Sequence, residues 1–417
     1  MNYSTTDTYK MKREIISFSK KFSSRLSSPE MKFIADMTYG IVSSKSCLLT
    51  QISQRLQENT KKRYTVDRLS NHLADGIPSN AQEDYLRFVR RITPLEPVVY
   101  IDDSDVIKPE GYHFESLGIV RDGSRSTPEK SVYCKGYHVT EACVLTSSNH
   151  PVSIFSEVHS STEKNFTSMN HITFAAMERG ANLFDKATYI MDRGYDDNKV
   201  FQKMWDLEQD FVVRLTRKRK LFFRGKWIPT ARLCAQRKGK VKLNLFYRGK
   251  EHEAYISHVK VQLTAAKRDV YLVLVYGITE QPMMLVTNKA ISCKEDVIKI
   301  ARLYFSRWKI EEYFRAKKQI FGFENFRVRK LKAINALNFY ISIAMAFLAH
   351  MTRKKAANTL LKSVLDAARP IKDKVQFYYY RIADGITELL RHAHSGIRDW
   401  FKPIRPNQNL LSFRLPA

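Results

Sequence analysis

Three groups of acidic residues, far apart in the sequence, have the side chains that metal-dependent phosphoryl chemistry requires. They are residues 102–105, Asp192 and the pair Glu311 and Glu312. Carboxylates are hard oxygen ligands for Mg²⁺, and two such ions can activate the attacking oxygen and stabilise the leaving oxygen in phosphodiester chemistry. Acids near strand ends also form turns and helix caps, so each group taken alone supports a structural interpretation equally well.

The third group lies in the segment YFSRWKIEEYFRAKKQ, residues 304–319, whose pattern predicts a helix. At 100° per residue, one face of this helix spans about 60° and carries four polar side chains: Tyr304, Arg307, Glu311 and Lys318. Glu312 lies about 100° away from Glu311. A carboxylate on this face could bind a metal while its cationic neighbours hold phosphates. An i,i+4 salt bridge between Arg307 and Glu311 is the alternative, and the helix alone does not separate the two.

The overall charge indicates a polyanionic partner. Lys and Arg total 70 against 42 Asp and Glu in 417 residues, a formal net charge of +28. This excess is larger than an ordinary metabolic enzyme needs, and it favours a nucleic-acid partner over a charge that serves solubility alone. Hydrophobic residues make up 44% of the chain, which is typical of a folded protein with two or three domains. The five cysteines are scattered without a C-x-x-C pair, which predicts a reducing cytosol and neither a zinc knuckle nor a disulfide framework.

The first 95 residues predict helices. Within residues 46–75 two amphipathic segments flank a polar break, with apolar positions on one face of each: Leu48, Leu49, Ile52 and Leu56, then Val66, Leu69 and Leu73. This is the outline of a helix-turn-helix whose second helix could enter a DNA groove. Other helical hairpins share the pattern, so an ordinary helical pair remains the alternative. No apolar segment typical of a secretory signal is found at the start of the sequence.

The central part of the chain alternates between strands and helices. Strands are predicted at VVYIDDSDVI, at a hairpin around TSSNHP, at ATYIM and at DFVVRL, with helices between the later ones. Residues 216–290 predict a β-rich insertion with the basic runs RKRK and RKGKVK, followed by helices to the end. The apolar run of residues 334–351 is long enough to cross a membrane, but its Asn, Ser and His residues favour a buried core helix.

The motifs together resemble the DDE transposases of bacterial insertion sequences. The segment at residues 304–319 fits Y-x-x-R-x-x-x-E-x6-K at every fixed position, YIMDRGYDD resembles the segment of the second aspartate, and YIDDSDV resembles the first. The resemblance extends from about residue 98 to residue 351. In the first motif the pattern D-x-[S/T] favours Asp102, with Asp103 as the alternative.

The resemblance implies an α/β fold with an RNase H-like core. Together with the patterns along the chain, it gives a helical DNA-binding domain (1–95), the first part of the core (96–215), the β-rich insertion (216–290), the core with the glutamate helix (291–351) and a helical, basic C-terminal region (352–417). Asp102, Asp192 and Glu311 would be catalytic and would bind two Mg²⁺ ions, with Mn²⁺ able to substitute. Tyr304, Arg307 and Lys318 would hold DNA.

The implied activity is cleavage at transposon ends followed by joining of the 3′-hydroxyl to target DNA. The implied partners are the terminal inverted repeats, the target DNA and a second copy of the chain, in the cytoplasm at the nucleoid and without a membrane. Two alternatives remain: an RNase H-like nuclease or resolvase that cuts without strand transfer, and a non-catalytic DNA-binding descendant. The presence of all three carboxylates argues against the second.

Overall fold

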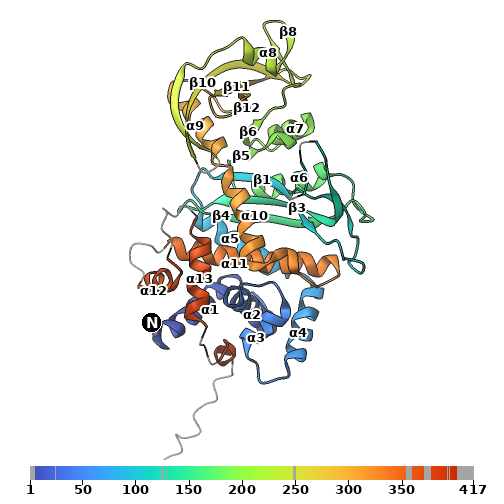
Figure 1. Ribbon diagram of the computed structural model, residues 1–417, viewed down its shortest axis with the longest axis vertical. Helices are drawn as coiled ribbons and strands as arrows, with labels where there is room; N and C mark the ends of the chain where they lie inside the picture. Colours follow the sequence, from blue (N-terminus) through green and yellow to red (C-terminus); the bar gives the residue numbers. More distant parts are fainter. Residues whose placement is uncertain are drawn as a thin grey trace, which may run out of the picture.

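Helices surround one large, mostly antiparallel sheet, so the chain has a mixed α/β architecture (Figure 1). The computed structural model describes residues 5–401, apart from residues 24, 124, 128, 248–249, 354–358, 371–376, 392 and 394. Buried apolar side chains from all parts of the described chain form one continuous hydrophobic core.

The centre of the sheet is built from the strands that the sequence predicts around the first two acidic groups. β1 is parallel to β5, which is parallel to β6, and β3 lies antiparallel on the other side of β1. β2 and β4 both pair with β3. The bounds are β1 (Val98–Ile107), β2 (Gly118–Arg121), β3 (Tyr133–Leu145), β4 (Pro151–His159), β5 (Thr188–Met191) and β6 (Asp210–Arg214). The sequence did not predict the short strand β2.

The β-rich stretch continues this sheet rather than forming a separate one. β12 pairs antiparallel with β6, and the order then runs through β11, β10, β7 and β8, with β9 on β10. The bounds are β7 (Lys220–Phe223), β8 (Lys226–Pro229), β9 (Val241–Tyr247), β10 (Lys250–Leu263), β11 (Arg268–Tyr276) and β12 (Met283–Thr287). The short helix α8 (Thr230–Ala235) lies among them at the top of Figure 1.

Two pairs of helices pack on the central strands. α6 (Met169–Leu183) contacts β3 and β4, and α7 (Asn198–Asp206) packs beside α6 and β6. α10 (Trp308–Phe321) crosses β1, and α11 (Leu331–Arg353) packs along β4. Gly322 directly follows α10 and caps it; its φ of 60° is the left-handed conformation that glycine adopts without strain.

The single helix predicted around the glutamates is wrong, because the structure divides it. α9 (Lys294–Phe305) ends before Ser306, and α10 begins after Arg307. The hydroxyl of Ser306 donates to the carbonyl of Leu303 at 2.6 Å and lies 2.6 Å from the hydroxyl of Tyr100 on β1. A serine that bonds back to its own helix and outward to a strand competes with the helical ladder, which bends the chain at this point.

The N-terminal helices pack around α11 at the lower end of the molecule (Figure 1). They are α1 (Thr5–Ser19), η1 (Lys20–Phe22), α2 (Ser28–Ser44), α3 (Leu49–Leu56), α4 (Lys62–Asp75) and α5 (Ser79–Ile92). Leu69 and Leu73 of α4 are fully buried, as predicted. The ring of Phe18 stacks edge-on against Phe88 of α5 and Phe347 of α11, so these helices share the central core.

α11 is a core helix, as its sequence predicts. It is long and apolar enough to cross a membrane, but 89% of its most apolar window is buried inside the protein. The described helices after it are α12 (Thr359–Ala367), α13 (Tyr379–Leu389) and η4 (Arg398–Phe401). Residues 402–417 of the predicted C-terminal helical region lie outside the described residues.

Candidate active site

The first two aspartates lie side by side on neighbouring parallel strands. Ile101 of β1 pairs with Met191 of β5. Asp102 is the next residue of β1, and Asp192 directly follows the last residue of β5. Neighbouring strands are about 5 Å apart, so the two carboxylates project from adjacent backbone positions. β1 has the bounds of the predicted run VVYIDDSDVI, and all the acids of the first group lie within it.

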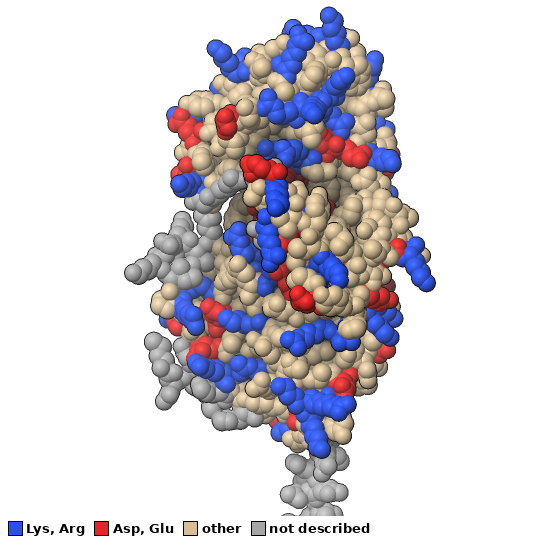
Figure 2. All heavy atoms as spheres, turned by 45° about the vertical axis from the view of Figure 1, so that its right-hand side comes forward, with Lys and Arg blue, Asp and Glu red and all other residues tan. Residues whose placement is uncertain are grey.

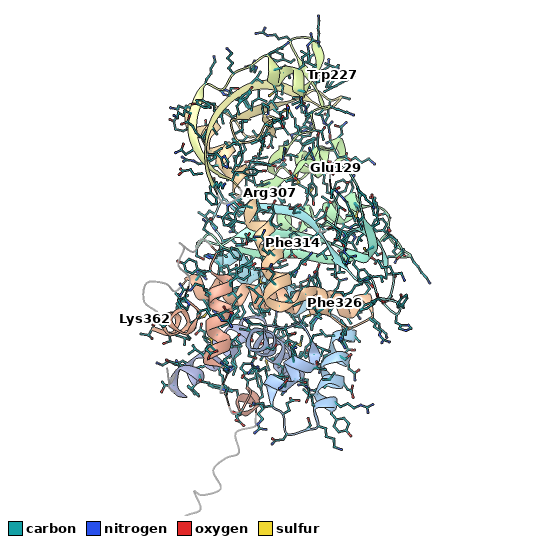
Figure 3. The ribbon with its side chains drawn as sticks, in the orientation of Figure 1. Glu129, Trp227, Arg307, Phe314, Phe326 and Lys362 are labelled. Atoms are coloured by element: carbon teal, nitrogen blue, oxygen red, sulfur yellow. The ribbon has the colours of Figure 1, made fainter. Side chains whose placement is uncertain are left out.

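Arg307 connects the first aspartate to the glutamate of α10. Its guanidinium donates to Oδ2 of Asp102 at 2.7 Å and also to the carboxylate of Glu311. In Figure 3, Arg307 lies at the junction of α9 and α10, between the insertion and the lower helices. The side chain of Arg307 is 16% exposed and that of Glu311 is 51% exposed. The structure therefore brings Asp102 and Glu311 to one cation, with Glu311 on the solvent side.

Tyr304 is tied to the second aspartate. Its hydroxyl donates to Oδ1 of Asp192 at 3.0 Å, and only 5% of the residue is exposed. Tyr304 lies in the last turn of α9, and Asp192 directly follows β5. This hydrogen bond therefore holds the end of α9 over the carboxyl end of β5. The residue lies at the site as predicted, but its hydroxyl is directed at a carboxylate within the protein.

The two aspartates have opposite pKa shifts. Burial raises the pKa of Asp102 to about 7, and the charges of Asp103 and Asp192 add to this rise against the opposing charge of Arg307. Burial also acts on Asp192, but Arg307, the backbone N–H of Arg193 and the hydroxyl of Tyr304 outweigh it and lower the pKa of Asp192. Paired acids whose surroundings separate their pKa values are typical of functional sites.

Asp103 points away from this cluster, as strand alternation requires. One of its carboxylate oxygens accepts from Thr140 of β3 at 2.5 Å, and the other accepts from Tyr195 at 2.9 Å. Tyr195 lies in η2 (Arg193–Tyr195), which directly follows Asp192. On the face of β1 opposite Asp102, Asp103 therefore links β1 to the segment that follows Asp192. Neither Thr140 nor Tyr195 was predicted from the sequence as part of the site, although Tyr195 belongs to the motif YIMDRGYDD.

The helix that carries Glu311 is anchored to the sheet by a buried ion pair. Nζ of Lys317 on α10 lies 2.8 Å from the carboxylate of Glu141 on β3, and both side chains are almost fully buried. Ser156 of β4 donates to the same carboxylate at 2.8 Å. Because a buried charge is costly without its partner, this pair stabilises one placement of α10 on the sheet, which positions Glu311.

The other predicted residues of α10 have partners of their own. Lys318 donates to the backbone carbonyl of Asp105 at 2.6 Å and pairs with Glu324 at 2.9 Å, so no contact links it to Arg307. Glu312 forms an ion pair with Arg315 one turn further along α10. Lys318 therefore lies on the predicted face but about two turns from the carboxylate cluster.

A cleft of about 790 Å³ opens at the cluster. Its walls include Asp192, Tyr304, Arg307 and Glu311, together with basic and aromatic side chains from β6, β9 of the insertion, α10 and the segment before α13: Arg214, Phe246, Tyr247, Arg315 and Phe377. Acids that share a cleft with cations and aromatic rings are the groups that suit a metal ion and a nucleic-acid strand together.

The three carboxylates suit a divalent cation by donor type, although they are not gathered around one point. Within the described parts of the chain, no group of three His, Cys, Asp or Glu residues is close enough to hold a metal ion. The guanidinium of Arg307 holds Asp102 and Glu311, which indicates that this position favours positive charge. A metal ion bound by all three carboxylates would require Arg307 to withdraw.

The comparison with protein families agrees with this geometry. The profile of the family described as transposase DDE domain matches residues 94–347, which is more than half of the chain and includes Asp102, Asp192 and Glu311. No match was found among curated proteins. The extent of the family match shows that the chain belongs to the family of transposase DDE domains.

Proposed function

We propose that this protein is a DNA transposase that cuts at the ends of its own element and joins the freed 3′-hydroxyl to target DNA. Membership of the DDE transposase family supports a DNA-cutting and DNA-joining enzyme. The observation that carries the proposal is the convergence of Asp102, Asp192 and Glu311, from three distant segments, on Arg307 and Tyr304 beside one cleft.

In this proposal Asp102, Asp192 and Glu311 are the metal ligands. Proteins of this family generally depend on a divalent metal, and we propose Mg²⁺ with Mn²⁺ able to substitute. When bound, the metal ions would supply Lewis-acid activation of the attacking oxygen and charge stabilisation of the leaving oxygen. No protein nucleophile is required, because water cleaves the first phosphodiester bond to a 3′-hydroxyl and a 5′-phosphate. The 3′-hydroxyl then attacks a target phosphodiester, forms a new bond to its phosphorus and releases the 3′-hydroxyl of the target strand.

The residues of the chain position the DNA and the carboxylates. Asp103 and Tyr195 hold the two aspartate strands together, and Tyr304 orients Asp192. Without DNA, Arg307 pairs with Asp102 and Glu311. When DNA is bound, its guanidinium would turn to a phosphate next to the scissile bond, because a planar guanidinium binds a phosphate as well as a carboxylate. Lys318, two turns further along the same helix face, would hold a neighbouring phosphate.

The strand order supports an RNase H-like core. β1, β5 and β6 are parallel, β3 lies antiparallel on the other side of β1, and β4 is antiparallel to β3, so that Asp102 within β1 lies beside Asp192 at the carboxyl end of β5. We propose residues 96–215 and 291–351 as this core, with residues 216–290 as an insertion between β6 and α9. Open α/β sheets bind ligands at this edge.

We propose that α3 and α4 recognise the terminal repeats. Lys61, Lys62, Arg63 and Tyr64 at the start of α4 are exposed, while Leu69 and Leu73 face the core. A recognition helix presents its N-terminal residues to base edges, so this orientation suits a helix-turn-helix. Arg63 and Asn71 are both exposed on the outer face of α4.

The insertion would supply contacts that do not depend on DNA sequence. Figure 2 shows Lys and Arg side chains spread over the top of the molecule, where the insertion lies. Cations on such a surface neutralise phosphates and make the affinity steeply salt-dependent. Synapsis of the two ends of an element implies at least a dimer, so we propose that a homodimer forms on DNA, in the cytoplasm at the nucleoid.

The test is the identity of the products formed with Mg²⁺, a terminal-repeat duplex and a circular target. A transposase gives covalently joined repeat–target molecules. Nicked or cut repeats without joined molecules would identify a nuclease or resolvase instead. Salt-sensitive DNA binding without any product would identify a non-catalytic descendant.

A further inference from the structure

A cavity of about 600 Å³ lies on the other side of α10 from Glu311. Lys309 lines it, two residues from Glu311, and a separation of 200° places the two side chains on opposite faces of the helix. The other walls include Tyr100 of β1, Ser306, Asn149 of the β3–β4 turn, and Arg302 and Lys299 of α9, together with apolar side chains of β1, β3 and α9. The cavity is therefore separate from the cleft that contains the carboxylates.

Lys309 is a buried cation without a counter-charge. Only 8% of the residue is exposed, and its ammonium donates to the neutral side-chain oxygen of Asn149. Within the described residues, no carboxylate is close enough to act on its charge. Buried charges in proteins are paired as a rule, because desolvation costs several kcal/mol when no opposite charge compensates it.

The turn between β3 and β4 keeps this arrangement in place. Asn149 has a φ of 66°, a left-handed conformation that asparagine tolerates better than most residues, and its N–H donates to the carbonyl of Thr146 at 2.8 Å. Two more cations, Arg302 and Lys299, are exposed at the rim. The one acid at the rim, Glu295, is exposed and forms no ion pair with Lys309.

We propose that this cavity is a second phosphate site, which holds a backbone phosphate of bound DNA with Lys309 at its base and Arg302 and Lys299 at its rim. The proposal rests on a DNA substrate, as in the proposed function. Tyr100 precedes Asp102 by two residues on the same face of β1, a distance of about 7 Å. This is the rise of about two nucleotides in a duplex strand, so DNA that crosses the junction of α9 and α10 from the cleft would bring another phosphate to the cavity.

The test is a salt titration of binding to a duplex of random sequence, with full-length Lys309→Met, Arg302→Met and Lys362→Met. Lys362 is exposed on α12, far from the cavity (Figure 3). Lys362→Met removes one positive charge, as the other two variants do, so it is the matched control. Lys309→Met and Arg302→Met should each reduce the slope of log affinity against log salt by about 1, while the control keeps the slope of the wild type.

Thermal unfolding separates this role from a structural one. Removal of an uncompensated buried charge should leave the melting temperature of Lys309→Met equal to or above that of the wild type. Because Arg302 is exposed, its variant tests the site even if Lys309→Met does not fold. If both variants keep the wild-type slope of log affinity against log salt, the proposed phosphate site is wrong. The proposed function would still stand in that case, provided that the wild type binds DNA.

Inorganic phosphate, at constant ionic strength, is the second probe. If phosphate raises the melting temperature of the wild type but not that of Lys309→Met, and the DNA slopes also fall, the site binds phosphate as proposed. If phosphate stabilises the wild type while the slopes stay unchanged, the cavity binds a free anion and the proposed DNA contact is wrong. If the wild type shows no salt-sensitive DNA binding at all, the proposed function itself fails.

Discussion

The guanidinium of Arg307 lies 2.7 Å from a carboxylate oxygen of Asp102, although the two residues are 205 positions apart in the sequence. The same guanidinium bonds Glu311, so one cation connects the first strand of the fold to the glutamate helix. This contact provides a counter-charge for Asp102, which is largely buried and has Asp103 and Asp192 as acidic neighbours. The position that suits a guanidinium in the protein alone suits divalent cations in the enzyme that we propose.

The neighbouring aspartates of β1 should have different roles. Asp102→Asn should abolish Mg²⁺-dependent cleavage and leave the melting temperature near that of the wild type, because it removes a metal ligand and relieves a buried charge. Asp103→Asn should retain measurable cleavage but lose about 1–3 kcal/mol of stability, because two buried hydroxyls lose an ionised acceptor. Cleavage assays and thermal unfolding distinguish them. If Asp103 alone proves essential for cleavage, the assignment from D-x-S is wrong.

His159 should make stability depend on pH. Burial, with the nearby charge of His138, lowers the pKa of His159 to about 4 from 6.5. Between these values the unfolded chain binds more protons, so the free energy of unfolding should rise as the pH increases from about 4 to 6.5. The full effect is on the order of 3 kcal/mol. Denaturant unfolding across this range should show a smaller rise for His159→Gln, and equal slopes would contradict the assignment.

The basic run of residues 217–220 should divide into DNA-binding and structural residues. Arg219 pairs with Asp196 at 2.6 Å and donates to Asn198, so Arg219→Ala should lower the melting temperature. Arg217, Lys218 and Lys220 are exposed, and their joint replacement by Ala should weaken binding to all DNA sequences and flatten the salt dependence. An unchanged salt slope in the triple variant would show that this run does not contact phosphates.

Recognition of the terminal repeat should depend on the outer face of α4. Deletion of residues 1–95 is not a usable test, because it would uncover the apolar surface of α11 that these helices bury. Arg63→Ala and Asn71→Ala should each reduce the preference for the repeat over random DNA by about 5- to 150-fold, equivalent to 1–3 kcal/mol per base contact. Arg91→Ala on α5 is the control, because it removes one exposed positive charge outside α4 and should keep the preference for the repeat. If the preference survives in both α4 variants, another element reads the repeat.

The site was predictable from the sequence where spacing along one element decides the geometry. The strand alternation of β1 separates Asp102 from Asp103, and the helical period groups Arg307 with Glu311. The bend at Ser306 was not predictable, because it depends on a hydroxyl contact with Tyr100, more than 200 residues away in the sequence. The roles of Thr140 and Lys317 also depend on pairing between distant strands and helices, which local patterns do not contain.

The succession of strands and helices along the central part of the chain, apart from β2, followed from the apolar runs, but the continuity of the sheet did not. β12 joins the insertion to β6 through a register that only the folded chain defines. The N-terminal helices were predictable from their amphipathic pattern, whereas their packing around α11 was not, because the apolar faces of several helices could cover it equally well.

The most direct test of the account compares the two neighbouring glutamates of α10 in cleavage of a terminal-repeat duplex with Mg²⁺. Glu311 bonds Arg307 at the carboxylate cluster, whereas Glu312 pairs with Arg315. Glu311→Gln should reduce cleavage by at least about 100-fold and leave DNA binding near that of the wild type, because it removes a metal ligand and no phosphate contact. Glu312→Gln should retain most of the activity. Equal losses of cleavage in the two variants, or full activity of Glu311→Gln, would contradict the assignment of the active site.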